Sequence, residues 1–340
     1  MTGLSKKLKI GLQPLAGGGE RNPYADRMAD NLRHLGDVLP FPSTREFTFN
    51  PFGAFRRRYD YLILNWIETA AYGPQGTPSF WRALRLHAYL LVAKAVAGRV
   101  IWVRHDNYPH GVISSGAKAY ATKLLARIED RVDVVITHSP VEAGGKRKYV
   151  PHPLYSTNAD APNPLAVKGY FFLFGHIAPY KKLDEVIRLV PAHINLVIAG
   201  PANNRAHLEK LQSLMRDKPN VHLLPGFMDS RVAARVALDS HGIIVANADA
   251  DMVVSGSYLY ALSLGVPLFA VTTPFVNWLG NTSGLGGVHA YDSLESLVGA
   301  LSVAAEADIR PTPAMVDELF GDAAVLQHLQ IAMGLPGVPR

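Results

Sequence analysis

Short apolar runs alternate with longer stretches of helical spacing along most of the chain. The runs are six to nine residues long and rich in Val, Ile, Leu and aromatic residues, which is typical of buried parallel strands. The stretches between them are long enough for crossover helices, so the pattern predicts an α/β fold built on parallel sheets. The predicted strands lie at 8–15, 59–66, 99–105, 132–139, 169–177, 195–200, 221–227, 242–247 and 266–271.

One segment interrupts this alternation. Residues 156–168, STNADAPNPLAVK, are rich in Pro, Asn and small residues and predict an interdomain linker. We therefore expect two doubly wound, Rossmann-like domains, 1–155 and 169–312, whose strand ends face a central cleft. Residues 313–340 show helical spacing, and two placements stay open, packing back on the first domain or capping the second.

Composition narrows the class of protein. The chain has 340 residues, of which 48% are hydrophobic and 18% charged, so it is globular and long enough for two domains. It has no cysteine, which excludes disulfides, thiolate zinc sites and a cysteine nucleophile. The N-terminal residues lack the apolar core of a signal peptide, and no apolar run is long enough to span a bilayer, so we expect a cytoplasmic protein.

Charge is distributed unevenly between the halves. Residues 1–160 carry a net charge of +9 and residues 161–340 a net charge of −3. Arginines and aromatic residues are interleaved at 50–59 and 80–99, a combination suited to the headgroup zone of an anionic membrane. A core helix with solvated arginines is the alternative for 80–99. No RNA-binding motif accompanies the basic residues, so we expect no nucleic-acid partner.

The run 251–271, DMVVSGSYLYALSLGVPLFAV, predicts a helix that begins at a Ser-Gly-Ser turn and ends before Gly-Val-Pro. Backbone N–H groups at the start of a helix bind phosphate oxygens well. The predicted ligand-binding residues here are Ser255, Gly256, Ser257 and Tyr258.

Three predicted strands of the second half end in glycine. A glycine lets a ligand approach the backbone closely, and Lys181, which follows the first of these strands, could neutralise a diphosphate. The Gly-Phe-Met turn at 226–228 has the composition of a turn that reads a nucleobase edge. The candidate binding residues of these strand ends are Gly175, His176, Lys181, Gly200, Gly226, Phe227 and Met228.

Polar and glycine residues also follow the strands of the first half. The loop 16–24, AGGGERNPY, resembles neither a dinucleotide fingerprint nor a P-loop. Asp249-Ala250-Asp251 matches a DxD pattern, but no His/Asp/Glu cluster has metal-ligand spacing, so we expect no metal and no cofactor. The candidate residues of this half are Gly17, Gly18, Gly19, Asn22, Tyr24, Glu68, His105, Asp106 and His110.

Taken in order, FGxxxPYKxxxxxI, LxIxG, VxLLPG and SGSxLxALSLGxP resemble the donor domain of GT-B glycosyltransferases. Within that fold the chain is most similar to the β-mannosyltransferases of xanthan-type exopolysaccharide assembly. This resemblance implies a GDP-mannose donor held by the second domain. It also implies a glycan acceptor, lipid-linked or soluble, that meets the first-half residues, and an enzyme peripheral on the inner face of the plasma membrane.

The chain departs from the retaining GT-B enzymes at the position of a glutamate pair. Met252 and Tyr260 replace the two glutamates, and His176 replaces an arginine, which favours an inverting mechanism. Inversion needs a general base, and Glu68 is the first candidate and Asp106 the second, with His105 and His110 orienting hydroxyls. A retaining transferase that uses a UDP-sugar, a nucleotide-sugar epimerase and a non-catalytic sugar-nucleotide-binding partner are the alternatives.

Overall fold

The computed structural model describes residues 7–15, 23–73, 77–106, 115–248, 253–305 and 309–336. The chain divides into two compact units, which we describe one at a time. The first comprises 1–153, 251–254 and 320–340, and the second comprises 154–250 and 255–319. No described helix combines the length and apolar character that crossing a membrane requires.

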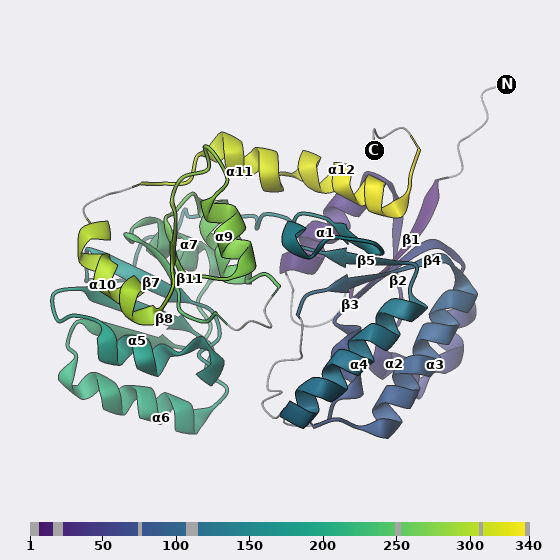
Figure 1. The fold of residues 1–340 in the computed structure, drawn as a ribbon, viewed down its shortest axis with the longest axis horizontal. Helices are drawn as coiled ribbons and strands as arrows, with labels where there is room; N and C mark the ends of the chain where they lie inside the picture. Colours follow the sequence, from purple (N-terminus) through teal and green to yellow (C-terminus); the bar gives the residue numbers. More distant parts are fainter. Residues whose placement is uncertain are drawn as a thin grey trace. The chain divides into compact units, whose positions relative to one another are not determined.

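The first unit contains a six-stranded sheet in the order β2-β1-β3-β4-β5-β6, and all its neighbouring strands run parallel. The central strands are buried along most of their length because helices cover both faces (Figure 1). The strands are β1 (Leu8–Gln13), β2 (Gly36–Pro40), β3 (Tyr59–Asn65), β4 (Ala97–Arg104), β5 (Val134–Thr137) and β6 (Arg147–Tyr149).

Two apolar cores hold this sheet between its helices. One core packs α3 and α4 against the sheet, and the other packs α1 and α12. The helices are α1 (Pro23–Arg33), α2 (Thr44–Phe49), α3 (Phe80–Val96), α4 (Ser115–Arg131) and α12 (Asp322–Met333), with short 3₁₀ turns η1 (Pro51–Arg56), η2 (Ile67–Ala71) and η4 (Pro140–Glu142).

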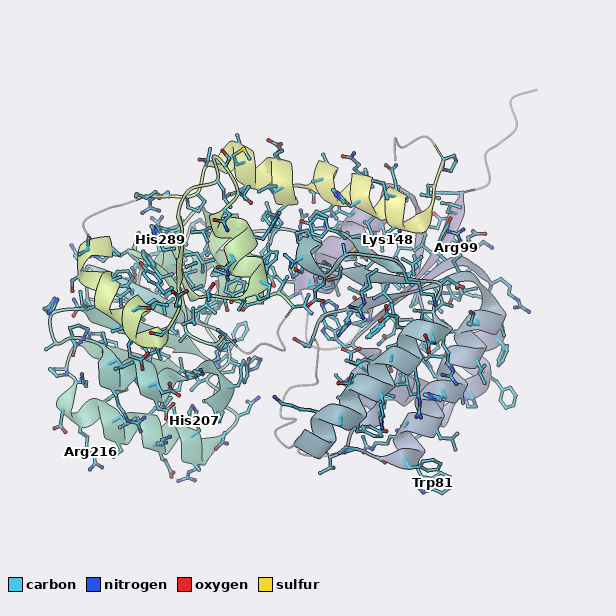
Figure 2. The ribbon with its side chains drawn as sticks, in the orientation of Figure 1. Trp81, Arg99, Lys148, His207, Arg216 and His289 are labelled. Atoms are coloured by element: carbon cyan, nitrogen blue, oxygen red, sulfur yellow. The ribbon has the colours of Figure 1, made fainter. Side chains whose placement is uncertain are left out.

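The last helix, α12, belongs to the first unit. Val325, Leu329 and Met333 lie in its core, and Asp322 accepts a hydrogen bond of 3.0 Å from the Asn31 amide of α1. At the other end Arg99, labelled in Figure 2, donates to the Met333 carbonyl oxygen at 3.1 Å. The segment 313–340 is therefore divided between the two units. Most of Pro313–Phe320, the helix before α12, belongs to the second unit.

The second unit has another six-stranded parallel sheet, in the order β12-β11-β10-β7-β8-β9. This is the doubly wound order of a Rossmann fold. The two sheets confirm the predicted α/β class with two doubly wound domains. The strands are β7 (Tyr170–Phe174), β8 (Asn195–Gly200), β9 (Val221–Pro225), β10 (Gly242–Val245), β11 (Leu268–Val271) and β12 (Val288–Tyr291).

Local signals fix the helix limits in this unit. Helix α8 begins after Ser255, whose side chain caps it, and ends at Gly265, whose φ of 63° lies in the left-handed region that glycine tolerates. The helices are α5 (Leu183–Leu189), α6 (Arg205–Leu214), α7 (Ser230–Leu238), α8 (Gly256–Leu264), α9 (Pro274–Gly280), α10 (Leu294–Ala304) and α11 (Pro313–Phe320), with 3₁₀ turns η5 (Pro179–Lys181) and η6 (Met215–Asp217).

Candidate functional site

The chain changes direction across the second sheet between β7 and β10. From β7 it proceeds to β8 and β9, and from β10 to β11 and β12 on the other side. Ligands of doubly wound folds bind at the carboxyl ends of the strands at such a switch point. A small pocket lies there, and its lining includes Phe174, Gly175, His176, Lys181, Asn247 and Ser257.

Three glycines follow one another across the carboxyl edge of β7, β8 and β9. Gly175, Gly200 and Gly226 have φ values of 110°, 145° and 130°, which side-chain-bearing residues rarely adopt. A β-carbon on Gly200 would lie 2.1 Å from the Gly175 carbonyl oxygen, so these two backbones touch. Around Gly226 the space is open, so a ligand can reach the backbone there, whereas the space at Gly175 is taken by a neighbouring side chain.

Lys181 reaches back from η5 to the end of β7. Its ammonium donates a hydrogen bond of 3.1 Å to the Phe174 carbonyl oxygen. A β-carbon on Gly175 would lie 2.7 Å from Lys181 Nζ, so the glycine makes room for this side chain. Burial lowers the pKa of Lys181 to about 8, because an ammonium is less stable away from water. An anion beside it would restore that stability.

The start of α8 reaches the same carbonyl group. Ser257 Oγ donates to the Phe174 oxygen over 3.5 Å, and the Ser257 N–H donates to the capping Ser255 Oγ at 3.3 Å. An ammonium group, a hydroxyl group and the positive end of a nine-residue helix thus meet at the end of β7. This combination suits the oxygens of a diphosphate.

Other predicted donor residues occupy different environments. Phe227 is 89% exposed beside Gly226, so its ring is open to stack on a planar ligand, whereas Met228 is half-buried. The Tyr258 side chain is fully buried and stacks on Phe275, with ring centroids 6.2 Å apart. Its side chain therefore supports α8 from the core, and only its backbone is left to meet the predicted ligand.

Tyr260 points into an aromatic environment. Its ring stacks on Phe174 with centroids 5.0 Å apart and meets the Tyr155 ring edge-on at 6.2 Å. The Tyr260 hydroxyl is buried, and it forms no hydrogen bond within the described residues. This surrounding is apolar and would disfavour a carboxylate.

In the first unit, Glu68 lies in η2 and is only 1% exposed. The indole N–H of Trp102 donates to Glu68 Oε2 at 3.1 Å, and Oε1 has no hydrogen-bond partner within the described residues. Burial raises the pKa of Glu68 to about 7, and the nearby Asp106 carboxylate adds to the rise. Asp106 itself is half-buried after β4, so it is more accessible than Glu68.

Tyr24 is at the centre of a group of rings at the same edge of the first sheet. It is 3% exposed, and its hydroxyl donates to His138 Nε2 at 3.0 Å, while His138 Nδ1 donates to the Val150 carbonyl oxygen at 2.8 Å. The His105 and His152 rings lie 4.8 and 4.9 Å from the Tyr24 ring. The buried Tyr24 side chain thus packs among rings at the strand ends, and its predicted contact with an acceptor stays a prediction.

His105 is held from two sides. Its Nε2 donates to Asn65 Oδ1 at 3.0 Å, and its ring stacks on Trp66 with centroids 4.3 Å apart. Trp66 has a φ of 52°, a left-handed conformation that is uncommon outside glycine and often marks functional sites. The sequence did not single out Trp66, His138 and His152. They lie at or just beyond strand ends, and this position is the signal that could have identified them.

Several predicted residues fall outside the described residues. They are Gly17, Gly18, Gly19, Asn22 and His110, together with Met252 and the DxD-like segment 249–251. Within the described part of the chain, no group of three or more His, Asp or Glu side chains could hold a metal ion.

Two parallel, doubly wound sheets, with a pocket at the switch point of the second, are typical of the GT-B class of fold. No protein-family model and no curated protein sequence matches the chain. Solved structures match the chain at low sequence identity, and this similarity shows the fold.

Three such structures are similar over nearly the whole chain. Anabaena HepE, in complex with UDP and glucose, is 14% identical, with a TM-score of 0.65 over 96% of this chain and 99% of HepE. AviGT4, a glycosyltransferase involved in avilamycin A biosynthesis, is 15% identical, with a TM-score of 0.59 over 96% of this chain and 98% of AviGT4. The catalytic domain of Arabidopsis thaliana starch synthase IV, bound to ADP and acarbose, is 9% identical, with a TM-score of 0.61 over 96% of this chain and 99% of that domain.

Proposed function

We propose that the chain is a glycosyltransferase that moves a sugar from a nucleotide-diphosphate donor to a glycan acceptor. The observation that carries the proposal is the meeting of Lys181, Ser257 and the start of α8 at the Phe174 carbonyl group, in a GT-B fold. These groups offset the charge of a leaving diphosphate without a metal ion. The proposed enzyme is therefore metal-independent and needs no cofactor.

The favoured donor is GDP-mannose, on the resemblance to β-mannosyltransferases. A UDP-sugar is the second candidate, because similar structures include HepE in complex with UDP-glucose. Thermal-shift measurements with UDP, GDP, ADP and TDP test the donor site, since a ligand of the folded state raises the melting temperature. If no nucleotide raises it, the proposed function is overturned.

The proposed stereochemistry is inversion, with a general base from the first unit. Asp106 is better placed than Glu68 to contact a hydroxyl, because Glu68 is buried and bonded to Trp102. We expect Asp106→Asn to abolish transfer and retain donor binding. Glu68→Gln, which keeps a hydrogen-bond acceptor for Trp102, is the matched comparison. Transfer by Asp106→Asn at the wild-type rate would remove Asp106 as the base.

The proposed acceptor is a polyprenyl-diphosphate-linked glycan of exopolysaccharide assembly, which places the enzyme on the inner face of the plasma membrane. The basic first half supports this location by its charge. Product analysis separates the rivals. An epimerase would change the donor sugar without an acceptor, and a non-catalytic partner would bind nucleotide with no turnover.

A further inference from the structure

The first unit exposes a group of large apolar side chains. Phe49, Phe52, Phe80, Trp81 and Leu91 are 80, 81, 71, 75 and 65% exposed. They come from α2, η1 and α3, which pack against one another. Figure 2 shows Trp81 projecting from the end of α3. We call these five residues the apolar patch.

Helix α3 is apolar on two sides. Its inner face buries Leu86, Tyr89, Leu90, Ala93 and Val96 in the core, so it already has a partner for packing. The α3 members of the apolar patch, Phe80, Trp81 and Leu91, lie outside that buried face. A water-facing helix normally carries polar residues there, and a large exposed apolar group is typical of a protein or membrane interaction site.

Basic side chains surround a pocket beside the apolar patch. The pocket has a volume of about 360 Å³, and its lining includes Thr44, Arg45, Thr48, Phe49, Arg82 and Arg85 and no acidic residue. Arg82 is oriented by a hydrogen bond of 2.8 Å to the Tyr72 carbonyl oxygen. Arg45 and Arg85 form no ion pair with any described carboxylate. Glu46, the neighbour of Arg45, closes the α2 cap by accepting from the Ser43 N–H.

We propose that this pocket binds the phosphate of an anionic phospholipid while the apolar patch enters the headgroup layer. Guanidinium groups bind phosphate oxygens bidentately, and two threonines that line the pocket bring further donors. Phe49 lines the pocket and belongs to the patch, so a phosphate bound there has apolar surface beside it for the acyl chains. The inference deepens the membrane part of the proposed function, but it does not depend on sugar transfer.

Vesicle flotation without donor or acceptor tests the pocket. We expect binding to phosphatidylcholine vesicles that contain phosphatidylglycerol, and much weaker binding to phosphatidylcholine alone. Arg45→Gln/Arg85→Gln should reduce partitioning about thirtyfold, since each basic residue near an anionic surface contributes about 1 kcal/mol and about 1.4 kcal/mol is tenfold.

The matched control is Lys148→Gln/Arg216→Gln, which removes the same charge from two exposed residues that do not line the pocket, both labelled in Figure 2. It should bind like wild type. Equal loss in both double variants would overturn the pocket in favour of unspecific charge attraction. The Arg45/Arg85 variant should bind nucleotide like the wild type. A failure of lipid binding can then be distinguished from a failure of the proposed sugar transfer.

Trp81 reports insertion. It is the most exposed of the four tryptophans, so lipids with brominated acyl chains should quench fluorescence that Trp81→Phe lacks. Absence of quenching would overturn insertion of the patch. Two results would overturn the proposal that a lipid occupies the pocket. One is that soluble glycerol phosphate saturates the pocket while the protein does not bind vesicles. The other is that the protein forms a dimer in solution that shields Trp81.

Discussion

Lys181 offers the sharpest test of the donor site. We expect Lys181→Met, which keeps the apolar stem, to weaken binding of the cognate nucleoside diphosphate. A hydrogen bond to a charged group contributes about 1.5–3 kcal/mol, which corresponds to about 10- to 150-fold in Kd. Isothermal titration calorimetry at neutral pH measures this, because a lysine with a pKa of about 8 is then mostly protonated.

The same substitution should stabilise the protein without ligand. Burial lowers the pKa of Lys181 from 10.5 to about 8, so the unfolded state binds more protons between these values. Stability of the wild type therefore rises with pH across that window, and Lys181→Met should lack this contribution. The wild-type affinity for the diphosphate should fall as pH rises through 8, since the free ammonium loses its proton there.

Lys182→Asn is the control for Lys181→Met. Lys182 has a φ of 53°, which asparagine tolerates, and its charge acts on Glu295, away from the Phe174 carbonyl group. It should bind nucleotide like the wild type. If Lys181→Met also binds like the wild type, or if both variants lose affinity equally, the assignment of Lys181 to the diphosphate is refuted.

Three further outcomes follow from the geometry. Gly200→Ala should lower the free energy of unfolding by about 2 kcal/mol or more in a denaturant titration, because its β-carbon would meet a backbone oxygen at 2.1 Å. Gly226→Ala, which has open space around it, should lower it less. Equal losses in the two variants would contradict the close contact at Gly200. Phe227→Ala should leave the melting temperature unchanged and weaken nucleotide binding about tenfold if the ring stacks on the base, while inorganic diphosphate binds as before. Burial lowers the pKa of His138 to about 4 and of His152 to about 3, so the unfolded state binds more protons below 6.5 and the free energy of unfolding should fall as pH drops from there towards 4; a flat profile would contradict their buried, neutral state.

The sequence predicted the interior strands well and missed three strands at sheet edges. Strands β2, β6 and β12 each lie at the end of a sheet. Their residues are only partly buried, so no continuous apolar run marks them. An interior parallel strand is apolar because both its faces are covered. An edge strand is predicted from the sequence only when it keeps an apolar run, as the fourth edge strand β9 does with Val221, Leu223 and Leu224.

Residues with a local signal were easier to place at a strand end than residues whose position depends on packing. Gly175 and Lys181 stand at a strand end, where the fold itself directs ligands. Tyr258 could not be assigned because α8 is apolar on all sides, so its sequence does not reveal which face is buried. Tyr24 and His138 come from distant segments, and only the folded sheet brings them within a hydrogen bond.

Tyr260 stands where the resemblance to retaining GT-B enzymes implies a glutamate, and its surroundings bear on the proposed mechanism. The Tyr260 ring lies between Phe174 and Tyr155, and its buried hydroxyl already lacks a partner among the described residues. A carboxylate at this position would be desolvated and disfavoured, so Tyr260→Glu should not by itself create a nucleophile. In the proposed transfer, the candidates for the base are therefore Asp106 and Glu68, the carboxylates at the strand ends of the first unit. The proposed inverting transfer needs only one base and a departing diphosphate, so it does not require a glutamate at position 260.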